Sequence, residues 1–183
     1  MGKILFLGIP LFCLTSLIWL FAQMEDFVIR GTVLIRYQGN EEHISIPSTV
    51  ASIGVEAFAG NPYRPVSIFL PSSITSIGYR AFANARGLRF IDIPPSVTTI
   101  GTYAFAGARS LSRVNIPTSV TSIGNFAFFG CRSLVAINIP SSVTSIGDYA
   151  FAGCTSLSSV VISRRTQIGR YAFPEGVQIS FSD

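Results

Sequence analysis

Few side chains in this 183-residue chain have types that could support catalysis or metal binding. His43 is the only histidine and follows Glu41 and Glu42, a grouping that suggests a metal or acid–base site. A zinc site needs about four ligands, and the sequence offers no second histidine to join this one. We therefore interpret His43 as a polar residue at an edge of the fold, and we expect no metal site.

Two sets of residues could still form a catalytic site if the fold brought them together. Ser67, His43 and Asp92 have the types of a hydrolase triad, and Asp92 with Asp148 has those of a glycosidase pair. Lysine chemistry is excluded because Lys3 is the only lysine. Whether these residues form a site depends on where the fold places them.

Cys131 and Cys154 are open to two interpretations. They can be small hydrophobic residues in the core, where free cysteine is common. They can also form a disulfide, provided that the chain is exported to an oxidising compartment and that the fold brings the two residues together.

Composition indicates a folded chain. Hydrophobic residues make up 49% of the sequence and charged residues 12%, which excludes intrinsic disorder. The formal net charge is +4, less than a dedicated nucleic-acid binder usually carries, so no nucleic-acid partner is expected.

Residues 1–22 have the layout of a signal peptide, with Lys3, the uncharged run Ile4–Phe21, and Ala22 at the cleavage position. An uncleaved membrane anchor is the alternative, because the apolar run is near the lower length limit for a span and Leu20 is a poor −3 residue. In either case we expect the rest of the chain to be exported to the cell surface, the periplasm or the medium.

Three dipeptide landmarks recur in one register and define six repeats. Ile-Gly recurs with its glycines 24, 23, 23, 23 and 22 residues apart, and Ala-Phe follows three residues after each glycine. An apolar-Pro pair precedes the first five of these glycines. Cys131 and Cys154 occupy one position in adjacent repeats, where Ala85 and Ala108 stand in earlier copies.

Each repeat predicts one strand, a corner and a return segment. Leu134, Ile137 and Ile139 end in the alternation of a strand, and Pro140 stops it because proline has no amide hydrogen. Gly147 then relieves the backbone at the corner. One coil cannot bury its apolar side alone, but stacked coils can. The repeated phenylalanines should therefore form a column through the core.

The motif in Ser133–Cys154 resembles the Treponema pallidum-type, or BspA-like, leucine-rich repeats almost residue for residue. The resemblance covers nearly the whole chain after the N-terminal segment. The expected fold is an α/β-type, mostly β repeat solenoid, short and right-handed, with about six 23-residue repeats. Parallel strands should line one face, with irregular or 3₁₀ turns on the other.

Three regions follow from this pattern. Residues 1–22 form the signal peptide or anchor, and 23–42 an N-terminal cap hairpin with its turn near Arg30-Gly31. Residues 43–183 form the solenoid, which ends in a degenerate C-terminal cap.

The same register excludes both catalytic arrangements. His43 and Ser67 should share one strand column, but Asp92 lies two strands from His43, about 9.6 Å away at the usual spacing. Asp92 and Asp148 fall on different sides of the coil. We therefore expect a protein that is not an enzyme and has no cofactor.

Two exposed surfaces remain as candidates for binding. On the strand face, outward aromatic side chains next to charged and amide groups resemble an interaction hot spot; the residues are Phe69, Phe90, Asp92, Arg113, Asn115 and Asn138. The alternative is that these aromatic rings merely cover each other on a plain surface.

On the turn side, Arg86, Arg109 and Arg132 stand in one column, where like charges about 5 Å apart repel. A sulfated or phosphorylated glycan, or lipid headgroups, could bridge them, whereas the alternative is a solvated rim. A further column is interpreted as packing; it contains Tyr103, Phe126, Tyr149 and Tyr171.

Members of the family that this chain resembles are mostly bacterial surface or secreted proteins, and some are implicated in adhesion. The resemblance therefore implies an adhesion-type module that binds protein or glycan ligands, host extracellular proteins among them. The alternative is a structural protein of the bacterial envelope that acts by self-association or by pairing with a partner. Contact with a membrane is expected only through residues 1–22, if they are not cleaved.

Overall fold

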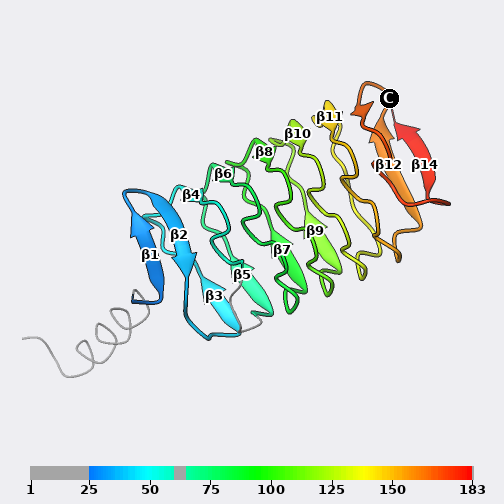
Figure 1. Ribbon diagram of the computed structural model, residues 1–183. Coiled ribbons are helices and arrows are strands. Elements are labelled where there is room, and N and C mark those ends of the chain that lie inside the picture. Colours follow the sequence, from blue (N-terminus) through cyan, green and yellow to red (C-terminus); the bar gives the residue numbers. More distant parts are fainter. Residues whose placement is uncertain (1–24, 60–64, 183) are drawn as a thin grey trace, which may run out of the picture.

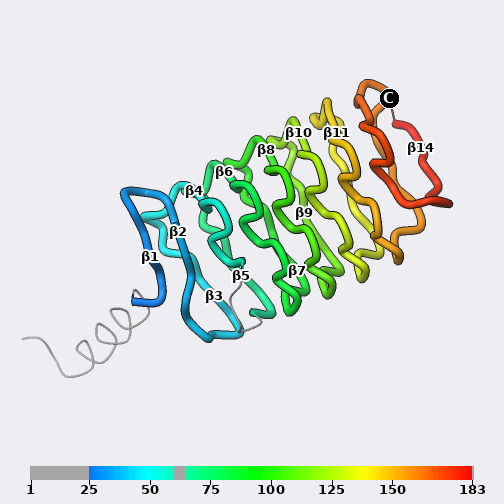
Figure 2. Tube along the Cα trace, viewed as in Figure 1, coloured from blue at the N-terminus to red at the C-terminus, as the bar shows by residue number. Residues whose placement is uncertain are grey.

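The computed structural model describes residues 25–59 and 65–182, which wind into a rod of stacked coils (Figure 1). The backbone trace advances along one axis, from a hairpin at one end to the C-terminal strand β14 (Gln178–Ser182) at the other (Figure 2). Each coil therefore contacts mainly the coil before it and the coil after it, as expected for a repeat protein.

A hairpin precedes the first coil. β1 (Phe27–Arg30) and β2 (Val33–Tyr37) pair antiparallel. Gly31 in their turn has a φ of 59°, which glycine adopts without steric strain. The ring of Tyr37 is buried and stacks on Phe58 with centroids 5.4 Å apart. The hairpin thus covers the apolar interior of the first coil.

The leucine-rich segments form the parallel ladder that the repeat predicted. Its four-stranded sheet contains β3 (His43–Ser45), β5 (Ser67–Phe69), β7 (Phe90–Asp92) and β9 (Arg113–Asn115). Single bridges through Asn138 extend it to β12 (Ser159–Ser163), which pairs in parallel with β14 (Gln178–Ser182). In each three-residue strand the middle residue is buried and the last one points outward.

A second parallel ladder lies at the Ser-Ile corners, which the sequence had suggested were plain turns. It continues from β2 through two-residue strands: β4 (Ser52–Ile53), β6 (Ser76–Ile77), β8 (Thr99–Ile100), β10 (Ser122–Ile123), β11 (Ser145–Ile146) and β13 (Gln167–Ile168). The backbone groups of adjacent corners lie one coil apart, so they hydrogen-bond to each other. The residue after each corner is glycine because a side chain would not fit there. A Cβ at Gly101, for example, would lie 2.6 Å from the carbonyl oxygen of Ile77.

The third side of each coil is the Ala-Phe segment, which consists of turns. Its amides also bond between coils; the N–H of Phe105, for example, donates to the carbonyl of Ala127 at 2.7 Å. The predicted phenylalanine column is confirmed, since successive ring centroids are 5.1 Å apart in the fully buried set of Phe82, Phe105, Phe128 and Phe151.

Candidate functional site

The strand face presents two outward columns whose members the ladder brings side by side. In the first column Ser67 pairs with Phe90, and Phe90 with Arg113. The second column contains Ser45, Phe69, Asp92, Asn115, Asn138 and Val161. The columns are those that the 23-residue period predicts, so all six candidate residues of the strand face lie on one surface.

Phe69 and Phe90 are the large apolar side chains at the centre of this surface. The exposed fractions of Phe69 and Phe90 are 65% and 48%, whereas the middle residues of the same strands, Ile68 and Ile91, are buried. The two rings stand on neighbouring strands in diagonal positions, within reach of each other across the sheet. A shallow hollow of about 230 Å³ lies here, lined by Ser67, Ile68, Phe69, Leu70, Phe90 and Asp92.

Charged and amide groups border the two rings. Asp92 follows Phe90 by two residues and faces outward in β7, next to Asn115 in β9. Arg113 stands beside Phe90. Within the parts of the chain that the structure describes, neither Asp92 nor Arg113 forms an ion pair. Both charges are therefore available to a partner that covers the aromatic rings.

The residues with catalytic types do not assemble. His43 Nδ1 and Ser67 Oγ are 2.7 Å apart, so the predicted column brings these two together on an exposed surface. Asp92 stands in β7, two strands away from β3 and in the other column, so it does not orient the imidazole. Asp148 lies on the turn side, where its carboxylate pairs with Arg170 at 3.1 Å.

The two cysteines are buried free thiols in this structure. The Sγ–H groups of Cys131 and Cys154 donate to the carbonyls of Phe105 and Phe128, each at 3.2 Å. A hydrogen bond with Cys154, together with burial, raises the pKa of the Cys131 thiol well above its usual value. The slot is the buried one that Ala85 and Ala108 fill in earlier coils, and the disulfide is not formed here.

The turn side carries the arginine column and the second aromatic column. Arg109 and Arg132 occupy equivalent, exposed positions of adjacent coils, because the backbone bonds place Gly107 next to Phe129-Gly130. The rings of Tyr103, Phe126, Tyr149 and Tyr171 stack one on the next, with centroids 4.6, 5.0 and 5.2 Å apart. The sequence predicted this packing correctly.

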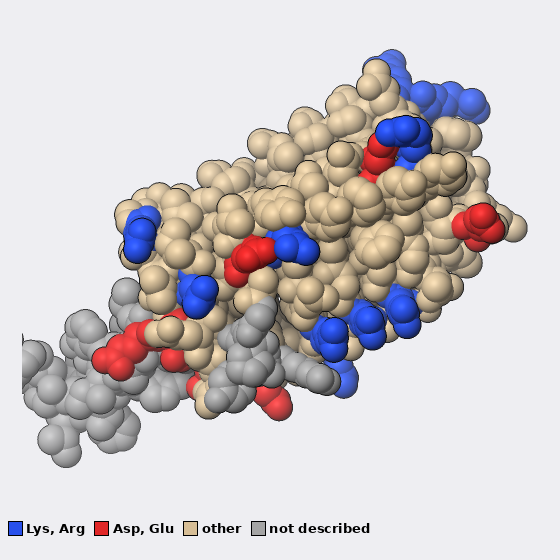
Figure 3. Space-filling view, in the orientation of Figure 1, with Lys and Arg blue, Asp and Glu red and all other residues tan. Residues whose placement is uncertain are grey.

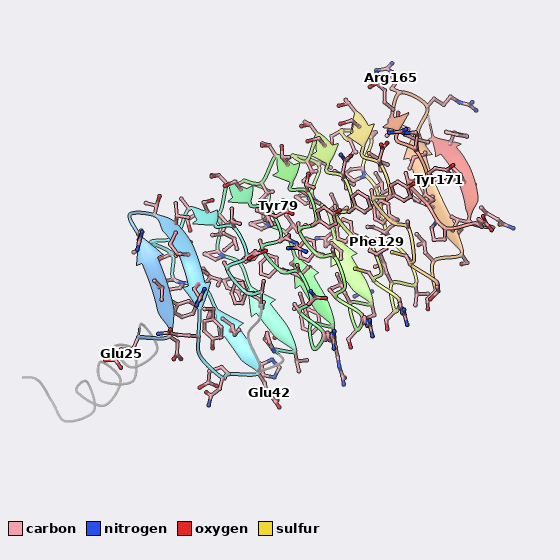
Figure 4. The ribbon with its side chains drawn as sticks, in the orientation of Figure 1. Glu25, Glu42, Tyr79, Phe129, Arg165 and Tyr171 are labelled. Carbon is pink, nitrogen blue, oxygen red and sulfur yellow. The ribbon has the colours of Figure 1, made fainter. Side chains whose placement is uncertain are left out.

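One feature of the turn side was missed by the sequence reasoning. Phe129 is 42% exposed and projects from the turn side, where it is labelled in Figure 4. A signal was present, because the residue after Ala-Phe is alanine in four other copies, at positions 59, 83, 106 and 152. The break in that pattern marks a hollow between coils.

A stack of short coils with parallel strands, a Leu-x-x-Ile-x-Ile strand motif and a buried phenylalanine column defines a leucine-rich repeat protein. The family model of the BspA type leucine rich repeat region matches residues 36–87 and 64–180, with six copies. The chain therefore belongs to the BspA-type leucine-rich repeat family.

Solved structures of bacterial proteins share this fold. The Treponema pallidum leucine-rich repeat protein TpLRR is 26% identical with a TM-score of 0.62, over 85% of this chain and 67% of that chain. A leucine-rich repeat protein from Eubacterium ventriosum is 24% identical with a TM-score of 0.59, over 86% of this chain and 51% of that one. The pneumococcal vaccine antigen PcpA is 21% identical with a TM-score of 0.54, over 86% and 35% respectively.

Comparison with curated proteins found no match. Among the residues that the structure describes, no group of three or more His, Cys, Asp or Glu side chains could hold a metal ion. No helix within 25–59 and 65–182 has the length and apolar character that crossing a bilayer requires. The predicted signal peptide or anchor, residues 1–22, lies outside the described residues.

Proposed function

We propose that this chain is an exported binding module that holds a partner protein against its strand face. The observation that carries the proposal is the pair of exposed rings, Phe69 and Phe90, on neighbouring strands of the sheet. Export is supported by the uncharged run Ile4–Phe21 behind Lys3.

The composition of the face matches what a protein partner recognises. Aromatic side chains that lose water on binding supply most of the affinity of an interface, and the polar rim around them excludes water. Asp92, Arg113 and Asn115 provide this rim, with charges of both signs and without internal ion pairs within the described residues. A small ligand is less well served, because the hollow beside the two rings is only about 230 Å³.

The adhesion role is part of the same proposal. The family resemblance favours host extracellular proteins as partners, and the rod offers them a continuous surface along consecutive coils. Self-association through the same face is the competing function, since two copies could cover each other's rings.

The test is a set of alanine variants of the full chain measured against immobilised extracellular-matrix proteins, namely collagen, laminin and fibronectin. We expect the native chain to bind at least one, and Phe90→Ala and Phe69→Ala each to weaken that binding by tenfold or more. Val161→Ala is the matched control, because Val161 is 52% exposed in the same column as Phe69 but at the far end of the face.

Two results would contradict the proposal. One is unchanged binding in both phenylalanine variants, with circular dichroism showing that they fold. The other is light scattering that shows a stable dimer lost in Phe90→Ala, which would assign the face to self-association.

A further inference from the structure

A hollow of about 320 Å³ lies on the turn side, away from the strand face. It spans several consecutive coils and is lined by arginine, aromatic and small residues. Arg80, Arg109 and Arg132 contribute the charge, Tyr103 and Phe129 contribute rings, and Gly130 forms part of the floor. No part of the proposed protein-binding surface lines it.

Small residues keep this hollow open. Gly107 and Gly130 have φ values of 73° and 70°, where a side chain would strain the backbone. A Cβ built at Gly130 would meet nothing within 4 Å, so the floor there faces open space. Phe129 forms a wall, with its ring edge-on to Phe126 at 5.8 Å between centroids.

The arginines differ in how they are held. Arg80 is fixed, because its guanidinium pairs with Glu56 at 3.0 Å and lies 5.7 Å from the ring centroids of both Tyr79 and Tyr103. Arg109 and Arg132 form no ion pair within the described residues. Two guanidinium groups are thus left free at the margin of the hollow.

Arg109 and Arg132 belong to a row of arginines that begins at Arg86. Arg86, Arg109 and Arg132 repeat at the spacing of the coils, about 4.8 Å per coil. Figure 3 shows basic side chains gathered along the lower margin of this face. Like charges so close repel unless an anion lies between them, so the row favours a ligand with several negative charges in a line.

We propose that this groove binds a linear anionic polysaccharide that runs along the axis of the rod. Arginine forks fit sulfate and carboxylate groups with paired hydrogen bonds, and the row offers one such fork in each of three consecutive coils. The apolar rings of Tyr103 and Phe129 give the sugar rings a surface to pack on. A flat bilayer fits this groove less well than a polysaccharide chain does. Its headgroups would rest on the projecting side chains and would not reach the glycine and alanine residues at the bottom of the groove.

The test is chromatography of the full chain on immobilised heparin across a salt series, with unsulfated dextran as the neutral reference. We expect retention of the native chain near physiological salt, about 0.15 M, and no retention on dextran. The double variant Arg109→Glu/Arg132→Glu should elute before that point. In titrations, the slope of log affinity against log salt should fall by about two, one for each arginine contact removed.

A matched variant separates the groove from the overall charge. Arg36→Glu/Arg165→Glu also lowers the formal net charge from +4 to zero, because each reversal removes two charges. Both of these arginines are exposed and lie away from the hollow; Arg165 is labelled at the far end of the rod in Figure 4. We expect this variant to elute close to the native chain. Equal losses in the two double variants would overturn the proposal, since binding would then follow net charge alone.

A third variant tests the aromatic wall. Phe129→Ala should weaken binding severalfold without changing the salt slope, because it removes packing and no charge. Unchanged affinity would show that the hollow is not the site. Capture of the chain by phosphatidylserine vesicles but not by heparin would assign the row to a membrane and would also overturn the proposal. The variants of the strand face should retain heparin binding, so this inference and the protein-binding function fail separately.

Discussion

Two columns of aromatic rings run along the rod side by side, one inside the coils and one on their outer surface. The inner column contains Phe82, Phe105, Phe128 and Phe151, which are fully buried with centroids 5.1 Å apart. The outer column contains Tyr103, Phe126, Tyr149 and Tyr171, with centroids 4.6 to 5.2 Å apart. Both spacings are close to the distance between strands in a sheet, so the stacking of coils sets them.

The columns differ in burial and in backbone. Tyr171, labelled at the end of the outer column in Figure 4, is 71% exposed. Each outer residue also has a positive φ, between 52° and 57°, which is unfavourable for a residue with a side chain. The inner residues do not share this backbone. Rings stacked at the same spacing therefore pack the core in the inner column, whereas in the outer column they shield a strained turn.

The largest expected effect on stability comes from replacing one ring in each column by alanine. Phe105→Ala should lower the free energy of unfolding by about 3–5 kcal/mol, because it leaves a cavity in a closely packed interior. Phe126→Ala should lower it by about 1–2 kcal/mol, since a ring that is only partly buried loses stacking and less burial than a core ring. Urea denaturation followed by circular dichroism measures both values. Similar losses in the two variants would show that the outer column carries as much of the fold as the inner one.

The backbone difference can be tested with glycine. At Phe126, glycine should be more stable than alanine by about 1 kcal/mol, because it adopts the positive φ without strain. At Phe105, glycine should be less stable than alanine by about 0.5–1 kcal/mol. The backbone there has no positive φ for glycine to relieve, and glycine raises the conformational entropy of the unfolded chain. The same denaturation experiment gives all four values. The same sign at both positions would remove backbone strain as the distinction between the columns.

Much of this fold could be predicted from the sequence, because three landmarks repeat in one register. That register gave the inner phenylalanine column, the outward order of Ser67, Phe90 and Arg113, and the stacked outer rings. The second ladder could not be predicted, because a two-residue strand is too short for the alternation of residues that marks a strand. It arises from the spacing of coils, which brings the backbone of one Ser-Ile corner next to another.

The hollow on the turn side could not be predicted either. It depends on the height of Phe129 above Gly130, the next residue, and above Gly107 of the preceding coil. It also depends on a positive φ that the sequence marks only where glycine stands. Asn84 adopts the same backbone with φ of 58°, and Tyr103 with 57°, without any glycine to announce it. Repeats therefore predict which residues align, whereas the shape of the surface depends on small differences between copies.

The smallest expected effect is a pH dependence of stability, which we expect from the outer column and not from the inner one. Asp148 Oδ1 accepts the backbone N–H of Arg170 at 2.7 Å, and Oδ2 accepts Nη2 of the same residue at 3.1 Å. The backbone hydrogen bond, with the guanidinium beside it, holds the pKa of Asp148 below its ordinary value. A carboxylate of this kind stabilises the fold above its pKa in the unfolded chain, about 4, and the benefit is lost as pH falls through the folded pKa.

Asp148→Asn isolates this charge, because Asn125 already accepts the equivalent backbone bond from Asp148 N–H at 2.8 Å in the preceding coil. We expect the variant to melt at most a few degrees below the native chain at pH 7, with the gap closing as the pH falls through the lowered pKa of Asp148, below which both side chains are neutral. Glu175→Gln, at an exposed position, is the control and should show no such closing gap. For Phe105→Ala the gap should stay constant across the same range, since no charge is involved. A gap for Asp148→Asn that stays constant or widens in acid would mean that the ion pair with Arg170 does not hold the last step of the outer column.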